Sequence, residues 1–378
     1  MKKIIAAACA AAILLSAGCS AFPNESSSVI LKESVLPAAE DKAYTPINYK
    51  EQVGMWLPYV RFPEIMQGKS EEQFRKAIRE LLQDAAAENV NTLYFHAHPM
   101  GDAYYRSEIF PHGTFLDGDY DPMQIVIDEA HKLGISVHGW INPLRLQTDD
   151  EMKMLPDDYI VRKWIDNGEP FVRNVNGRWF LSPSYPETVE LIEAAVGELL
   201  ENYNIDGVHI DDYFYPSTDE EFDRDAFEKS GSTDLVQWRT ENVSRYVKAI
   251  YDKVKSFDKR LLFGISPQGN IDSDYTSQYA DVRRWSSEEG FCDYIVPQLY
   301  FGFENECCPF LQTLAQWEEL VKDGVVTLIA GLAPYKLGRE DKWAGAAGEL
   351  EWINQPDIID RQIAAVKNSS ADGYALYY

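Results

Sequence analysis

Positive charge is scarce in this sequence. It holds 35 Lys and Arg residues against 61 Asp and Glu residues, which gives a formal net charge of -26 at pH 7. Binding to a nucleic acid needs a basic surface that replaces the counterions of the phosphates. The composition therefore argues against a nucleic-acid partner and favours an acidic, well-solvated surface.

The motifs of nucleotide-binding and serine-nucleophile enzymes are also absent. The sequence contains no GxGxxG, no Walker loop, no GxSxG elbow and no CxxC pair. After the first fifty residues only Cys292, Cys307 and Cys308 remain, and three cysteines cannot all pair with one another. We expect no cofactor, and a single disulfide among these cysteines stays open.

Histidine, a common ligand of catalytic zinc, occurs only six times. His96 and His98 have the spacing of paired ligands in amidohydrolase barrels, but such sites also need histidines from later strands. His209 is the last histidine of the chain. We therefore expect no metal centre, although a metal-dependent hydrolase remains an alternative.

Only one long apolar run occurs, Ile4–Leu15, and it is too short to span a bilayer as a lasting helix. Two lysines precede it, and the small residues before Cys19 are typical of a bacterial lipobox. We predict a signal peptide over residues 1–18, a lipid on Cys19, and a flexible tether over residues 19–50. The remaining domain, 51–378, would then be anchored to a membrane at the cell envelope, outside the cytoplasm.

Eight strand patterns alternate with helical patterns in that domain. The strand candidates are Val53–Trp56, Thr92–His96, Ser136–Ile141, Val208–Asp211, Leu262–Ser266, Tyr294–Pro297, Val326–Gly331 and Gly373–Tyr377. The helix candidates with clear ends are Ser70–Glu88, Pro122–Gly134, Pro186–Tyr203, Ser232–Phe257, Phe310–Lys322 and Pro356–Asn368. This alternation predicts an α/β fold, a (β/α)8 barrel of the TIM type.

A long insertion separates the third and fourth strands, over residues 143–181. Within it we predict a short helix near Asp157–Asp166 and a β-hairpin that turns at Asn176-Gly177, the favoured chemistry of a two-residue turn.

The segment 204–216, NIDGVHIDDYFYP, is the most informative stretch of the chain. In a barrel strand, Val208 would face the outer helices, while His209 and Asp211 would point inward. Asp211 then lies at the carboxyl end, where barrel enzymes hold their catalytic groups. We expect His209 to hydrogen-bond to Asp211 and to tune its pKa.

Polar and aromatic residues gather at the ends of other strands too. Aromatic faces pack on sugar rings, while amides and carboxylates bind hydroxyl groups, so the pattern favours a polysaccharide partner. The predicted substrate contacts are His98, Asn142, Arg145, His209, Tyr213, Gln298 and Tyr300.

Five ordered blocks resemble a known family. They read NTLYFHAHPMGDAYYRSEIFP, AHKLGISVHGWINPLR, NIDGVHIDDYFYP, GISPQG and PQLYFG. Together they resemble the divergent bacterial glycosyl-hydrolase-like family ten, over roughly residues 50–378. The resemblance implies a TIM-type barrel and a glycosidase activity, and the family includes lipoproteins that cut peptidoglycan glycan strands stripped of stem peptides. The positions that match its motifs are Asp102, Arg145, Asp211, Asp212, Gln298 and Tyr300.

Cleavage of a glycosidic bond needs an acid and a nucleophile or base. We expect Asp211 to be the nucleophile or electrostatic stabiliser and Asp212 to be the acid. Because adjacent strand residues point apart, Asp102 and Glu304 are alternates for the second carboxylate. A substrate-assisted route would need only one acid.

The sequence thus predicts a glycoside hydrolase that acts on a cell-wall or other polysaccharide, foremost on peptidoglycan glycan strands. The alternatives are a non-catalytic polysaccharide-binding lipoprotein on a decayed barrel and a metal-dependent hydrolase.

Overall fold

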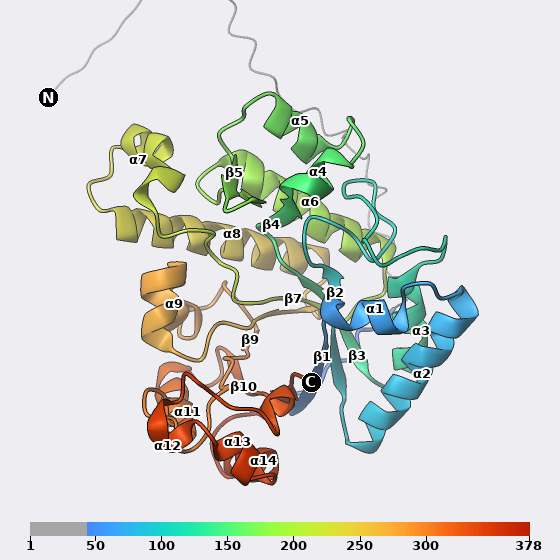
Figure 1. Cartoon of the computed structure of the whole chain (residues 1–378), viewed down its shortest axis with the longest axis vertical. Coiled ribbons are helices and arrows are strands. Elements are labelled where there is room, and N and C mark those ends of the chain that lie inside the picture. Colours follow the sequence, from blue (N-terminus) through green and yellow to red (C-terminus); the bar gives the residue numbers. More distant parts are fainter. Residues whose placement is uncertain (1–43) are drawn as a thin grey trace, which may run out of the picture. The chain divides into compact units, whose positions relative to one another are not determined.

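A computed structural model describes residues 44–378, whose strands close into a parallel eight-stranded barrel (Figure 1). The predictions for residues 1–43, including the signal peptide and Cys19, lie outside the described residues. The strands follow one another around the barrel in the order β1-β11-β10-β9-β8-β7-β3-β2. Their bounds are Gln52–Leu57 (β1), Thr92–His98 (β2), Ser136–Ile141 (β3), Gly207–Ile210 (β7), Leu262–Ile265 (β8), Tyr294–Ile295 (β9), Thr327–Leu332 (β10) and Gly373–Leu376 (β11). Each overlaps one of the eight predicted strands, which confirms the TIM-type barrel.

Both faces of these strands are buried, as expected for a parallel sheet covered by helices. All seven residues of β2 are buried. Leu93 and Phe95 belong to the large cluster between strands and helices, whereas Tyr94 belongs to a separate cluster that fills the barrel. The period of two along each strand therefore separates an outer core from an inner one.

The outer helices begin at local capping signals. Ser70 and Gln73 form the predicted capping box at the start of α2, and Asp121 caps α3. The predicted helix from Ser232 begins instead at Leu235, because Asp234 accepts the hydrogen bond of the first turn. The bounds of the six long helices are Glu71–Ala87 (α2), Pro122–Lys132 (α3), Pro186–Asn202 (α6), Leu235–Phe257 (α8), Phe310–Leu320 (α11) and Ile358–Lys367 (α14).

Several shorter helices lie in the loops. Their bounds are Phe62–Ile65 (α1), Arg224–Ser230 (α7), Ile271–Gln278 (α9), Val282–Trp285 (α10), Gly345–Gly348 (α12) and Glu351–Asn354 (α13), with 3-10 turns at Tyr59–Arg61, Glu220–Phe222 and Pro334–Lys336. None of these short elements was predicted from the sequence. None of the helices within residues 44–378 combines the length and apolarity that crossing a membrane requires.

The insertion between β3 and β7 builds a small sheet of its own, drawn in green in Figure 1. Its antiparallel strands run in the order β4-β6-β5, with bounds Arg145–Thr148 (β4), Val172–Val175 (β5) and Arg178–Leu181 (β6). Asn176 and Gly177, with φ of 51° and 84°, make the predicted hairpin turn. Helix α5, Ile160–Asp166, lies at the predicted place, whereas β4 and helix α4, Asp149–Lys153, were not predicted.

A chain of hydrogen bonds runs through the inside of the barrel. The Trp56 indole donates to Nε2 of His209 at 3.1 Å, and the Tyr294 hydroxyl lies 3.1 Å from Nδ1 of His209 and 2.6 Å from Nδ1 of His138. Nε2 of His138 lies 3.2 Å from Oδ1 of Asn48. With both imidazoles neutral, every donor meets an acceptor, and burial lowers the pKa of both histidines. The inward position of His209 is as predicted, but the prediction that it bonds to Asp211 is wrong, because Trp56 and Tyr294 occupy both ring nitrogens.

The last residues of the predicted tether bind the amino-terminal end of the barrel. Buried Asp206 accepts hydrogen bonds from the Tyr44 hydroxyl, from the Ile47 peptide nitrogen at 2.6 Å and from the Val137 peptide nitrogen at 2.7 Å. His131 contacts the same carboxylate at 2.9 Å. Residues from Tyr44 onward are therefore part of the barrel, and the predicted tether boundary at residue 50 is too late.

Candidate active site

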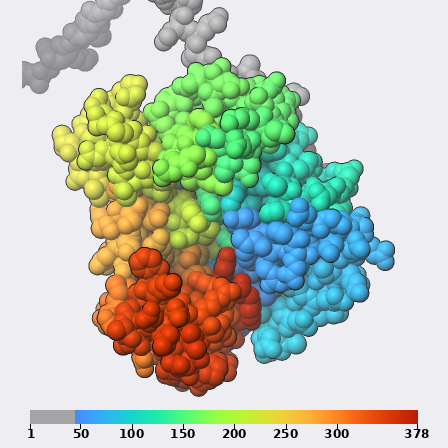
Figure 2. Space-filling view, viewed as in Figure 1, coloured from blue at the N-terminus to red at the C-terminus, as the bar shows by residue number. Residues whose placement is uncertain are grey.

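A pocket of about 270 Å³ opens among the carboxyl ends of the barrel strands. Segments far apart in the chain meet there, the blue end of β1, the yellow-green residues after β7 and the red C-terminal residues, on the face shown in Figure 2. The lining residues are Trp56, Trp140, Asp211, Asp212, Tyr213, Ser266, Gln298, Tyr300, Tyr335 and Tyr377. Six of these ten side chains are aromatic, so the wall combines flat apolar faces with a few polar groups.

The two carboxylates of the pocket, Asp211 and Asp212, directly follow strand β7. It ends at Ile210, whose carbonyl accepts from the Ser266 peptide nitrogen at 2.8 Å, so Asp211 and Asp212 leave the sheet at its rim. Asp211 is 7% exposed, and its Oδ1 accepts the Tyr213 peptide N–H at 3.4 Å. Adjacent residues within a strand would point to opposite faces, but Asp211 and Asp212 both follow the last residue of β7, and both line the pocket.

The two carboxyls differ in what surrounds them. Burial, and then the negative charge of Asp212, raise the pKa of Asp211 well above its usual range. Burial also raises the pKa of Asp212, but hydrogen bonds from Gln298 and Gln268 oppose that shift by stabilising its anion. The charge of Arg145 favours the ionised form of both. The pair therefore holds a proton to higher pH than a free carboxyl. The pKa of Asp211 is raised further than that of Asp212, although hydrogen bonds from the Tyr213 peptide N–H and the Trp140 side chain also stabilise the Asp211 anion.

Arg145 reaches this pocket from the insertion. Its guanidinium carbon lies 4.0 Å from the centre of the Tyr213 ring, which is a cation–π contact. Its Nε is buried and has no hydrogen-bond partner among residues 44–378. Arg145 therefore lies next to the pocket through Tyr213 but is not one of its lining residues.

The other predicted contacts support the walls. The Gln298 amide donates to the Ser266 carbonyl at 3.3 Å, and the ring of Tyr300 lies 6.0 Å from that of Tyr335. Asn142 is fully buried, and its Oδ1 accepts from the Trp140 indole at 3.1 Å. Asn142 thus positions a wall residue and does not itself line the pocket.

Four further predicted residues lie outside this pocket. His98 is buried with its ring centre 4.1 Å from that of Phe110, and burial lowers its pKa to about 4. His209 lies below the pocket in the hydrogen-bonded chain described above. Asp102 lines a different cavity, and Glu304 is exposed, with its peptide nitrogen bonded to Glu351 at 2.9 Å. The structure therefore does not bring the alternates Asp102 and Glu304 to the Asp211 pocket.

Trp56 and Tyr377 line the pocket but were not predicted as site residues. Each lies near the end of a strand that the sequence did reveal, the first and the last of the barrel. Applying the strand-end argument to these two strands, as to the other six, would have found them.

Metal and thiol chemistry have few candidate groups. Within residues 44–378, no group of three or more His, Cys, Asp or Glu side chains is placed to hold a metal ion. Cys292, Cys307 and Cys308 are all free thiols, and the sulfurs of the adjacent pair lie 3.8 Å apart.

Comparison with known proteins identifies the family. The family described as Glycosyl hydrolase-like 10 matches residues 52–345. The chain belongs to this family. Among curated relatives, the glycosyl hydrolase DigH of Escherichia coli strain K12 is 28% identical over 390 residues, covering 92% of this chain and 87% of DigH. The glycosyl hydrolase YngK of Bacillus subtilis strain 168 is 30% identical over 332 residues, covering 80% of this chain and 63% of YngK.

Solved structures of glycoside hydrolases share the fold of this Glycosyl hydrolase-like 10 protein. The glycoside hydrolase domain of PgaB (BpsB) from Bordetella bronchiseptica superposes with a TM-score of 0.56 at 12% identity, covering 87% of this chain and 93% of that domain. An Anoxybacillus alpha-amylase gives 0.53 at 10% identity, covering 88% and 71%. At these identities the likeness concerns the fold alone.

Proposed function

We propose that this protein is a glycoside hydrolase that cleaves a cell-wall polysaccharide, foremost peptidoglycan glycan strands. The observation that carries the proposal is the pair Asp211 and Asp212, two carboxyls of unequal surroundings in an aromatic-walled pocket. Glycosidases need two such carboxyls with different protonation states. Membership of a glycosyl hydrolase-like family supports the same conclusion.

The surroundings of the two carboxyls suggest their roles. Asp211, whose pKa is raised further, carries the shared proton and donates it to the glycosidic oxygen as the bond to the anomeric carbon breaks. Asp212, held as an anion by Gln298 and Gln268, faces the positive charge that develops at that carbon. This assignment exchanges the roles expected from the sequence alone.

The aromatic walls would bind the sugar. Trp56, Tyr300 and Tyr377 offer ring faces for packing. Arg145 contacts the lining residue Tyr213, and its charge favours the ionised form of the two carboxyls.

The first test is product analysis with the full chain on peptidoglycan glycan with and without stem peptides. New reducing ends from the stripped glycan, lost in Asp211→Asn and Asp212→Asn variants that remain folded, are the expected result. Intact glycan after long incubation, together with measurable binding, would replace the proposal by the non-catalytic polysaccharide-binding function.

A second test separates the two roles by leaving group. An acid is dispensable when the leaving group is a stable phenolate, so Asp211→Asn should retain far more activity on an activated aryl glycoside than on the natural glycan. Asp212→Ala should lose activity on both substrates. The opposite pattern would restore the roles expected from the sequence.

We further propose that residues 1–18 are a signal peptide and that a lipid on Cys19 anchors the protein to a membrane of the cell envelope. The sequence before Cys19 supports this part of the proposal.

A further inference from the structure

The Asp211 pocket is small for a polymer. Its volume of about 270 Å³ lies below the roughly 300–1,000 Å³ of ordinary ligand pockets. It accommodates little more than the sugar at the cleaved bond, so the neighbouring units of a glycan chain need another place to bind.

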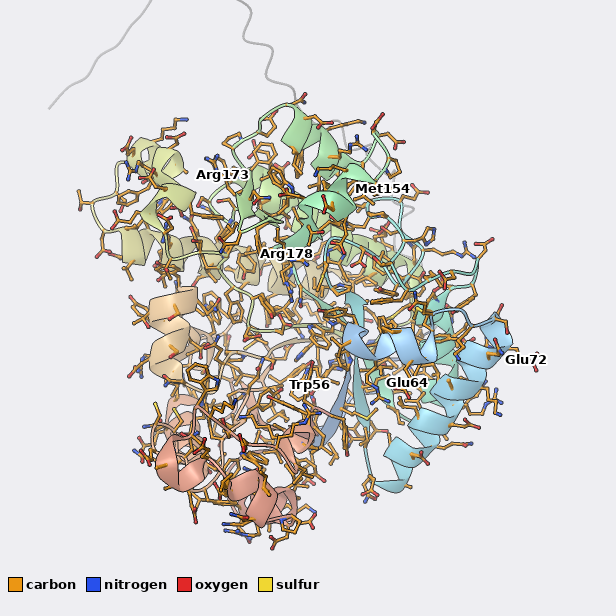
Figure 3. The ribbon with its side chains drawn as sticks, viewed as in Figure 1. Trp56, Glu64, Glu72, Met154, Arg173 and Arg178 are labelled. Atoms are coloured by element: carbon orange, nitrogen blue, oxygen red, sulfur yellow. The ribbon has the colours of Figure 1, made fainter. Side chains whose placement is uncertain are left out.

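A larger cavity of about 440 Å³ lies beside the insertion. Its walls come from the loops after β1 and β2 and from the green insertion, on which Figure 3 shows Met154 and Arg178. The residues on which the argument depends are Tyr59, Asp102, Phe115, Gln147, Met154 and Arg178.

Two connections join this cavity to the Asp211 pocket. The first is a row of rings, in which Trp140 of the pocket stacks on His96 at 3.6 Å and His96 meets Tyr59 of the cavity edge-on at 5.5 Å. The second is strand β4, on which Arg145 contacts the pocket residue Tyr213 and Gln147 lines the cavity. The pairing of β4 with β6 shifts register between Arg145 and Thr148, so strict alternation of faces does not hold there. Strand β4 nevertheless borders both spaces, through Arg145 at one and Gln147 at the other.

One polar group of this cavity lacks a donor. Gln147 is 5% exposed, its amide nitrogen donates to the Gly101 carbonyl at 2.6 Å, and its Oε1 is buried with no hydrogen-bond partner among the described residues. Asp102 is also buried, with Oδ1 accepting the Met100 peptide N–H at 2.9 Å. A buried acceptor left without a partner destabilises the protein, so a ligand O–H or N–H that donates to Oε1 of Gln147 binds favourably.

The remaining walls define the class of ligand. Tyr59, Phe115 and the 85% exposed Met154 offer apolar surfaces on which a sugar ring can pack. Asp102 and Glu151 bring two negative charges to the same cavity, against the one positive charge of Arg178, whose guanidinium donates to the Leu146 carbonyl at 2.6 Å. Like charges repel, so an anionic sugar is disfavoured.

We propose that this cavity, between Asp102 and the insertion, is a second saccharide subsite that binds a neutral sugar unit of the glycan beside the unit cleaved at Asp211. The inference rests on the proposed glycosidase function and specifies its substrate. Gln147 and Asp102 accept hydrogen bonds from the hydroxyl or acetamido groups of that unit.

The test fills the cavity from its rim. Thr114 is exposed and lines the cavity, so Thr114→Trp blocks it without removing a buried polar group. For N-acetylglucosamine oligomers long enough to reach the cavity, we expect KM of the Thr114→Trp variant to be about tenfold or more above that of the unmodified protein. A tenfold rise corresponds to one lost contact of about 1.4 kcal/mol. The rate constant on a short aryl glycoside, which occupies the Asp211 pocket alone, should not change. Thr233→Trp, at an exposed threonine outside both cavities, is the matched control and should behave like the unmodified protein.

The outcomes separate this inference from the function on which it rests. If the protein cleaves no glycan, binding of the same oligomers to the Asp211→Asn protein, weakened by Thr114→Trp, would support the subsite while the hydrolase proposal fails. Cleavage of long oligomers with the same KM in the Thr114→Trp protein would overturn the subsite. An oligomer with carboxylates at C6 should bind more weakly than the neutral oligomer. The nearly isosteric Asp102→Asn variant should reduce this preference for the neutral oligomer. If the preference did not change, Asp102 would have no part in the subsite.

Discussion

Single residues decide the chemistry of the pocket through their neighbours. Asp211 and Asp212 are adjacent in sequence, but only Asp212 receives hydrogen bonds from Gln298 and Gln268. These contacts come from the ends of β8 and β9, so the inequality of the two carboxyls depends on residues more than fifty positions away.

The pH dependence of catalysis should reveal this inequality. Because the pKa of Asp211 is raised, its proton is present at moderate pH and is lost as the pH rises through that pKa. Because Asp212 acts as an anion, activity also falls when low pH protonates the pair. We expect a bell-shaped profile of kcat/KM on the natural glycan, and Asp211→Asn should abolish its alkaline limb on an activated aryl glycoside. An alkaline limb unchanged in that variant would assign it to another group.

Elements with strong local signals have the expected bounds, and those without such signals were missed. Helix α2 begins at a capping box that the sequence displays, because the bonding residues lie within one turn of each other. Helix α7 and strand β4 have seven and four residues, too few for a periodic pattern to show. Tertiary packing stabilises them, and β4 carries Arg145 to the pocket.

The cap of α2 offers a direct test of this local control. Ser70→Ala removes the side-chain acceptor of the Gln73 peptide N–H, so the free energy of unfolding should fall by about 1 kcal/mol. Denaturant unfolding followed by circular dichroism measures this change. Ser277→Ala, at an exposed position of α9, should change the free energy by less than about 0.5 kcal/mol. Equal effects of the two substitutions would contradict the role of the cap.

At the scale of the whole molecule, closure of the barrel joins the two ends of the described chain. β1 pairs with β11, so that Gln52 lies opposite Gly373. The segment before β1 is bound below the barrel through the buried carboxylate of Asp206.

The hydrogen bonds that Asp206 accepts should contribute strongly to the stability of the folded protein. We call them the Asp206 clamp. Asp206→Asn places an amide N–H₂ where the carboxylate accepts hydrogen bonds from four groups, so we expect a loss on the order of 3 kcal/mol in the free energy of unfolding. Asp150→Asn is the matched control, because its side chain is 95% exposed and its ion pair with Lys153 contributes little. Similar unfolding midpoints for both variants would argue against the clamp.

The attachment of the whole protein to a membrane is a separate prediction. Cys19→Ser removes the thiol that would carry the lipid, so metabolic labelling with a palmitate analogue should be lost and the protein should leave the membrane fraction. Retention of the label in that variant would show that the lipid is attached at another residue.

The sequence by itself determined the barrel and the family, and it predicted that Asp211 and Asp212 lie at the carboxyl end of a strand, because strand periodicity, helix caps and the 204–216 motif are local in the chain. It did not determine which residues share the pocket. His209 was expected to hydrogen-bond to Asp211, but its two ring nitrogens bond to Trp56 and Tyr294 inside the barrel. Trp56 and Tyr377 lie near the ends of strands that the sequence reveals, but barrel closure brings these two strands together. The hydrogen-bond partners inside the barrel depend on side-chain packing between distant segments, and no local pattern encodes them.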